Sequence, residues 1–90
     1  MTKAVLTVIG CDRVGIIAAV SSCLAEANVN ILDISQTTMQ EIFTMVMLVD
    51  VSGARVEFHL LAKQLSELGE TLGMKIQLQH VDIFNSMHKI

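Results

Sequence analysis

The sequence predicts an α+β fold of four strands and two helices, in the order strand, helix, strand, strand, helix, strand. Two stretches carry apolar residues at helical spacing, four shorter stretches are apolar in the manner of strands, and Gly or Asn stands at several of the breaks between them. This order consists of two βαβ halves with right-handed crossovers. The compact arrangement is therefore a four-stranded antiparallel sheet with both helices on one face, the ferredoxin-like βαββαβ sandwich.

The first strand is predicted at 3–9, and a helix follows from Ile16. Both alternating faces of the strand are apolar, which is typical of a central strand. Asn28 is expected to close the helix because asparagine tolerates the left-handed conformation. An inward apolar stripe consists of Ile16, Val20, Cys23, Leu24 and Ala27. Small or weakly polar residues that would let another helix approach closely are Ala18, Ser21, Ser22, Ala25 and Glu26.

The second and third strands are predicted at 30–39 and 42–51, joined by a short turn. Adjacent Ile31 and Leu32 interrupt the alternation of the second strand, which favours a bulge or an edge strand. Both faces of the third strand are largely apolar, whereas the open face of such a sheet is normally polar. We therefore expect another subunit or the chain's own tail to cover the open face.

The second helix is predicted at 55–72 and the fourth strand at 74–83. Gly73 supplies the stop between them. The helix buries one apolar stripe, which consists of Phe58, Leu61, Leu65, Leu68 and Leu72. Residues 1–83 are expected to form one domain. The tail at 84–90 carries apolar residues at helical spacing, which predicts a short helix that packs on the domain or on a partner subunit.

Composition excludes several classes of function. The chain has 90 residues, of which 52% are hydrophobic and 3% aromatic. This is more apolar content than so small a domain easily buries, so we expect a homo-oligomer, a dimer or larger. With a net charge of −3, scattered basic residues and few aromatic ones, nucleic acid is not an expected partner. No apolar run reaches the roughly 20 residues of a membrane span, and the start lacks a signal-peptide pattern, so a cytoplasmic location is expected.

No catalytic, metal or cofactor site is predicted. Cys11 and Cys23 lack a CxxC spacing and are expected to be free thiols, with Cys23 in the core. Cys11 stands near a helix N-terminus, which can favour a thiolate, but no partner for a catalytic dyad is identifiable. His80, Asp82 and His88 lack the tight spacing of a metal site. The protein is therefore expected not to be an enzyme.

The turn between the first strand and the first helix is the best candidate for a ligand site. It has the sequence GCDRVGII at 10–17, in which Gly10 and Gly15 permit a positive φ or a close backbone approach. Asp12 stands where its carboxylate could cap the free N–H groups of the helix. A helix N-terminus favours anionic groups. The alternative is a capped turn that binds nothing.

The chain resembles the ACT domain, a ligand-binding regulatory module of amino-acid metabolism. In that family a loop of the form polar-(Arg/Lys)-x-Gly-(Ile/Val/Leu) joins the first strand to the first helix, and an Asn-Ile pair opens the second strand. The matching residues here are Asp12, Arg13, Val14, Gly15, Ile16, Asn30 and Ile31. The resemblance extends over about residues 4–80 and is strongest to small stand-alone ACT proteins, which are similar to one half of the glycine cleavage repressor regulator.

The resemblance implies a non-enzymatic module that binds an amino acid in a pocket between two domains. Asp12 would meet the ligand's ammonium, the N–H groups of 14–16 its carboxylate, and Asn30 either group. The sequence departs from a serine-binding member, which would have Asn where Asp12 stands and His near Gly10. Val14 also replaces a frequent Pro, and Asn28 a frequent Gly. The alternative is an adaptor in metabolic regulation that binds a regulatory protein and no small ligand.

Overall fold

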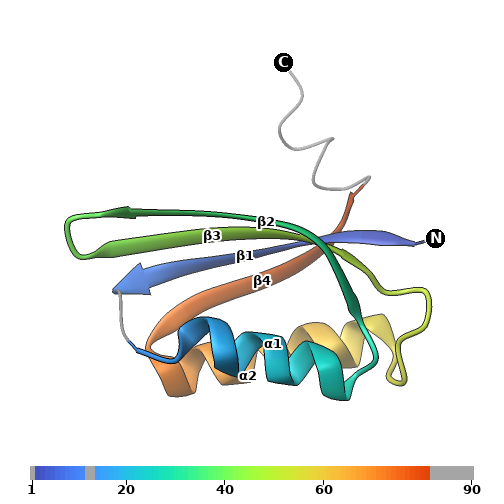
Figure 1. Ribbon diagram of the computed structural model, residues 1–90. Coiled ribbons are helices and arrows are strands. Elements are labelled where there is room, and N and C mark those ends of the chain that lie inside the picture. The colour runs from blue at the N-terminus through green and yellow to red at the C-terminus, as the bar shows by residue number, and fades with distance from the viewer. Residues whose placement is uncertain (1, 12–13, 82–90) are drawn as a thin grey trace.

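A computed structural model describes residues 2–11 and 14–81, and the predicted order of elements is confirmed. The fold is the expected βαββαβ sandwich (Figure 1). Its elements are β1 (Lys3–Cys11), α1 (Ile16–Glu26), β2 (Asn30–Met39), β3 (Ile42–Asp50), α2 (Phe58–Leu72) and β4 (Met74–His80).

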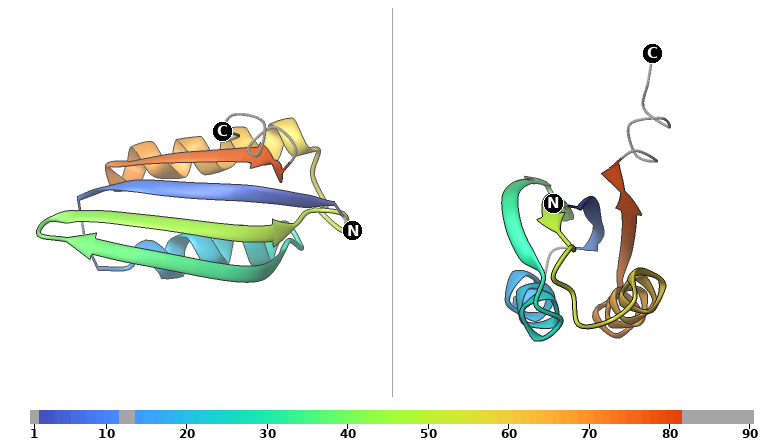
Figure 2. Two further views of the ribbon diagram at one scale, coloured as in Figure 1. Left: turned by 90° about the horizontal axis from the view of Figure 1, so that it is seen from above. Right: turned by 90° about the vertical axis from the view of Figure 1, so that its right-hand side faces the viewer.

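The four strands form one antiparallel sheet in the order β2-β3-β1-β4. Both helices lie on one face, with α1 beneath the β2 side and α2 beneath the β4 side (Figure 2). Cys11 pairs with Ile42 at one end of the sheet, and Lys3 pairs with Asp50 at the other. We call these the Cys11 end and the Asp50 end. The face away from the helices is called the open face.

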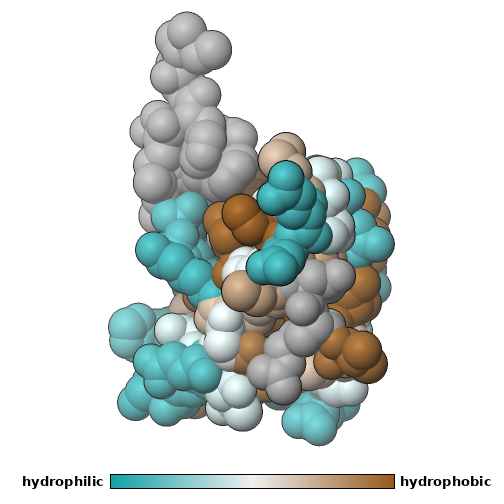
Figure 3. Space-filling view, turned by 90° about the vertical axis from the view of Figure 1, so that its left-hand side faces the viewer, coloured by the Kyte–Doolittle hydropathy of each residue, from teal (hydrophilic) through white to brown (hydrophobic). Residues whose placement is uncertain are grey.

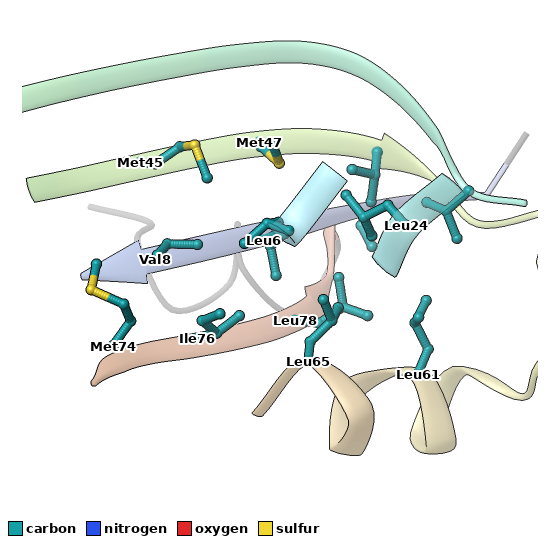
Figure 4. Packing of buried hydrophobic residues seen from close by; sticks show 14 of the residues in the cluster. Leu6, Val8, Leu24, Met45, Met47, Leu61, Leu65, Met74, Ile76 and Leu78 are labelled. Carbon is teal, nitrogen blue, oxygen red and sulfur yellow. The ribbon is translucent and has the colours of Figure 1, made fainter. Parts of the chain in front are cut away.

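The core lies between the sheet and the helices and is aliphatic and rich in methionine, as the composition requires. Every second residue of β1, β3 and β4 points into it, because side chains alternate along a strand. Figure 4 shows these side chains meeting the helices, among them Leu6, Val8, Met45, Met47, Ile76 and Leu78 from the sheet, with Leu24, Leu61 and Leu65 from the helices. Each fully buried leucine contributes roughly 1.5–3 kcal/mol.

The end of α1 is tied to the segment that precedes α2. Asn28 has a φ of 60°, as predicted, and its Nδ2 donates to the Gly53 carbonyl at 2.9 Å. The Arg55 amide donates to the Ala27 carbonyl at 2.8 Å. The predicted start of the second helix at Arg55 is wrong, because this long-range bond holds Arg55 in the connection and α2 begins at Phe58.

Two strands end elsewhere than predicted. β1 continues beyond 9 to Cys11 because its last residues pair with β3. β4 ends at His80, whereas the prediction extended it to 83; residues 82 and 83 and the tail at 84–90 lie outside the described residues. β2 is an edge strand with a register shift between Ile31 and Asp33, which confirms both the edge position and the bulge.

The open face carries apolar side chains in its middle, as predicted. Ile9, Ile42 and Val46 are 47%, 56% and 38% exposed. They belong to β1 and β3, which are flanked by strands on both sides. Among the described helices, none is long and apolar enough to cross a membrane.

Candidate functional site

The two glycines of the turn are explained by different constraints. Gly15 is the N-cap of α1 and has a φ of 90°, a conformation that side chains disfavour. Its carbonyl accepts a hydrogen bond from the Ala19 amide at 2.9 Å. At Gly10, a Cβ would lie 2.5 Å from the Met74 Sδ and 3.1 Å from the Gly73 carbonyl oxygen. The φ at Gly15 therefore favours glycine, whereas a Cβ at Gly10 would require the flexible end of the Met74 side chain to shift.

The start of α1 offers backbone donors to an anion. Because Gly15 has no side chain, the N-cap residue cannot itself satisfy the free N–H groups of the first turn. Ile16 anchors the helix in the core, whereas Val14 is fully exposed. Asp12 and Arg13 lie outside the described residues, and so does the cap expected from Asp12. Figure 3 shows this end of the molecule, where apolar surface borders the turn; the exposed apolar residues include Met39 and Ile42.

The other half of the predicted site lies at the opposite end of the sheet. Asn30 is exposed at the start of β2 and pairs with Asp50, whereas Ile31 is half-buried and packs on the core. Eight residue steps along β1 separate the two ends, about 26 Å at the usual rise of a strand. One chain therefore does not bring the turn and Asn30 together.

Both halves lie on the same flank of the molecule. The helix α1 runs along the β2 side of the sheet (Figure 2), starting near the Cys11 end and finishing beside Asn30. A second copy placed along this flank and turned by 180° would bring its own Asn30 to the turn of the first. A site that combined the turn with Asn30 would therefore need residues from two chains, as the predicted location between subunits supposes.

Asp50 is a candidate site residue that the sequence analysis did not identify. It stands directly opposite Asn30 and on the same face. The Ser52 hydroxyl donates to its Oδ1 at 2.7 Å and the Ser52 amide at 3.0 Å. These hydrogen bonds lower the pKa of Asp50, so its carboxylate stays ionised beside Asn30. An Asp-x-Ser sequence at a strand end was the available signal for this arrangement.

The lowered pKa of Asp50 predicts a dependence of stability on pH. Because the pKa is lower in the folded than in the unfolded chain, the stabilisation is complete above the unfolded value of about 3.9 and is lost as pH falls through the folded value. We expect Asp50→Asn to flatten the loss of stability on acidification below about pH 5. Urea denaturation at a series of pH values measures this, with Ser52→Ala as a second variant that removes the hydroxyl bond. Parallel curves for all three proteins would contradict it.

The described cysteines and histidines lie apart from one another or against other residues. Cys11 is exposed at the end of β1. Cys23 is half-buried rather than fully in the core, and burial, followed by the charge of Glu26, raises the pKa of its thiol. His80 stacks on Phe58, with ring centroids 3.8 Å apart. No group of three or more potential metal ligands occurs within 2–11 and 14–81.

Two hollows among the described residues are not lined by any predicted site residue. One of about 310 Å³ lies between the helices and is lined by Cys23, Glu26, Ala27, Val56 and Gln64. Another, of about 280 Å³, lies between α2 and β4 and is lined by Ala62, Ser66, Ile76, Gln77, Leu78 and Gln79.

Comparison with known proteins identifies the family. The family model of the ACT domain matches residues 2–79. The chain is 54% identical over 90 residues to UPF0237 protein MJ1558 of Methanocaldococcus jannaschii, covering 100% of both. It is similar to the structure of an ACT domain protein from Streptococcus pneumoniae, with 43% identity, a TM-score of 0.80 and coverage of 92% and 93% of the two chains. The fold is also that of a putative glycine cleavage system transcriptional repressor, with 24% identity, a TM-score of 0.73 and coverage of 89% of this chain and 46% of the other. The chain therefore belongs to the ACT domain family.

Proposed function

We propose that the protein is a regulatory, non-catalytic ACT module that acts in the cytoplasm and binds an amino acid between two copies of the chain. The ACT unit would comprise residues 1–83, with 84–90 as a tail that packs on it or on a partner. The site would be formed by Asp12, Arg13, Val14, Gly15, Ile16, Asn30 and Ile31, to which we add Asp50. The observation that supports this most directly is the placement of the two half-sites at opposite ends of one flank.

The flank has the features of a surface that pairs with itself. β2 is an edge strand whose residues are exposed almost throughout, and such an edge offers unpaired backbone groups to another strand. A two-fold axis beside it would pair β2 with its copy in antiparallel register. On α1, small exposed residues would let the two helices approach closely; they include Ala18, Ser22 and Ala25.

The chemistry of the two half-sites suits a zwitterion. The N–H groups at the start of α1 would bind a carboxylate, since a helix N-terminus favours negative charge. Asp12 on the same chain, and Asp50 and Asn30 on the other, would accept hydrogen bonds from an ammonium, which are stronger than those between neutral groups. Free amino acids carry both charged groups one carbon apart. An amino acid is therefore the ligand class we propose.

A ligand held between two chains would act by stabilising their association. A molecule that binds only the assembled form stabilises it by RT ln(1 + [L]/Kd), or about 2.7 kcal/mol at a ligand concentration of 100 Kd. The protein would thus report the concentration of the amino acid through its assembly.

Thermal denaturation in the presence of each of the twenty amino acids at millimolar concentration tests this function. We expect at least one of them to raise the melting temperature, and Asn30→Ala to abolish that rise. Gln64→Ala, which changes an exposed polar residue on α2, away from the β2 edge, is the matched control and should keep it. If no amino acid shifts the melting temperature of the wild-type protein, the proposal fails.

The exposed apolar residues of the open face support a second candidate function. Ile9, Ile42 and Val46 would suit a regulatory protein partner, in which case the module is an adaptor without a small ligand. The thermal measurement separates the two functions, because an adaptor would not respond to any amino acid.

A further inference from the structure

The open face has an apolar centre that nothing in the proposed ligand site uses. We define the open-face patch by Ile9, Ile42, Val46 and Leu48, which lie on the two central strands and share one face. Three of them are more than a third exposed. Apolar surface in the middle of a sheet, rather than at its edge, is typical of a face that packs against another layer.

A hollow of about 120 Å³ lies at one corner of this face. It is lined by Asp33, Ile34, Ser35, Val46 and Leu48. One hydrogen bond restrains the Asp33 carboxylate at this hollow: its Oδ1 accepts from the Ile34 amide at 2.9 Å. An apolar floor with a carboxylate at its rim is complementary to a lysine, whose aliphatic stem packs on apolar surface while its ammonium seeks an anion.

The same face carries such a lysine at the diagonally opposite corner. Lys75 is exposed on β4, directly opposite Ile9, and therefore shares the open face. Asp33 is on β2, opposite Leu48. A single chain thus displays both a lysine and a hollow that fits a lysine, on one surface and too far apart to meet.

The positions of the Asp33 hollow and of Lys75 determine where a two-fold axis between two copies would lie. They are three strand spacings apart across the sheet, about 14 Å, and four residues apart along it, about 13 Å. Consider the diagonal from Asp33 to Lys75. A two-fold axis that lies between two stacked faces, perpendicular to this diagonal, places Lys75 of each copy over Asp33 of the other. It passes between Thr7 and Val46, a cross-strand pair at the centre of the patch. Because the diagonal runs at about 45° to the strands, the two sheets cross at about 90°, one of the two usual angles of sheet packing.

We propose that two copies of this protein pack through their open faces, with Lys75 of each copy in the Asp33 hollow of the other. The interface covers the open-face patch on both copies and makes the same ion pair twice, as an isologous contact must. The occupant is a second copy of the chain because both complementary features lie on this surface and one axis relates them. This interface is separate from the β2 flank and extends the proposed assembly to a second face.

Charge exchange tests the proposal. At low salt, sedimentation velocity over a range of concentrations should show that Lys75→Asp and Asp33→Lys each raise the dissociation constant of this interface about tenfold or more, because both ion pairs become repulsive. The double variant Lys75→Asp with Asp33→Lys should recover most of the wild-type affinity. Lys63→Asp, which changes an exposed lysine on α2, is the matched control and should associate like the wild type.

A second pair of variants tests the patch itself. Val46→Lys places a charge at the proposed axis and should abolish association through this face. Leu60→Lys changes a residue of α2 that is exposed to a similar degree, 45%, and should not. Circular dichroism before sedimentation verifies that each variant is folded.

Two results would overturn the proposal: association of the single charge variants equal to that of the wild type, or a double variant no better than the worse single one. A monomeric wild-type protein, or an open face occupied by another protein or by residues 84–90, would give the first result. The amino-acid response is measured separately and depends on Asn30 and the turn. If the open faces do not associate, an amino acid can still raise the melting temperature. If no amino acid binds, the charge variants can still change the dissociation constant of the open-face interface.

Discussion

Gly69→Ala is expected to lower the free energy of unfolding by about 1–3 kcal/mol. This reverses the usual effect, since replacing glycine by alanine inside a helix stabilises by roughly 0.5–1 kcal/mol. Gly69 is buried on the face of α2 that touches β4, and a Cβ there would lie 2.6 Å from the Met74 carbonyl oxygen and 3.0 Å from the Ile76 Cγ1. Because the nearest atom is backbone, α2 must move away from the sheet.

Urea denaturation of Gly69→Ala beside Glu70→Ala measures the effect. Glu70 is the next residue of the same helix and is exposed, so its replacement should change the stability by no more than about 0.5 kcal/mol. A stabilised Gly69→Ala protein would show that helix propensity outweighs the contact and that α2 is not held closely on β4.

Periodicity was sufficient to predict the architecture, because the core depends on local alternation. Ile16, Val20 and Leu65 are buried where the helical patterns place them. Boundaries that depend on partners distant in sequence were missed. Arg55 continues a helical pattern, yet its amide bonds to Ala27, 28 positions earlier, and no local pattern reports that bond. Cys11 is likewise in a strand only because Ile42 lies opposite.

The candidate site was less accessible from the sequence than the fold. Local chemistry explains why Gly15 stands at the start of α1, and the structure confirms its positive φ. That Asn30 lies at the far end of the sheet follows from strand order and register, which one sequence does not display. Asp50 was missed as a possible site residue for the same reason, since it becomes a neighbour of Asn30 only through pairing of β2 with β3.

Mixing two variants that each bind the ligand weakly is expected to restore wild-type binding at part of the sites. Gly15→Val damages the turn, because valine strongly disfavours a φ of 90°, while the open space around this position spares the fold. Asn30→Ala removes the other half-site. Each variant alone should bind the amino acid identified by thermal denaturation about 10- to 100-fold more weakly, the effect of losing hydrogen bonds to a charged group. In a mixed dimer, one of the two sites combines the intact turn of the Asn30→Ala chain with the intact Asn30 of the Gly15→Val chain.

The fraction of ligand sites that regain wild-type affinity follows from the two-fold symmetry of the dimer. Random exchange makes about half of the dimers mixed, each with one intact site of two, so about a quarter of all sites should bind with the wild-type affinity. Calorimetric titration of the exchanged mixture measures that fraction. A mixture of Asn30→Ala and Asp50→Asn is the matched control, because both changes damage the same half-site and no intact site forms. A Gly15→Val and Asn30→Ala mixture that binds no better than its components would mean that the turn and Asn30 do not meet across two chains, since the distance along β1 prevents them from meeting within one.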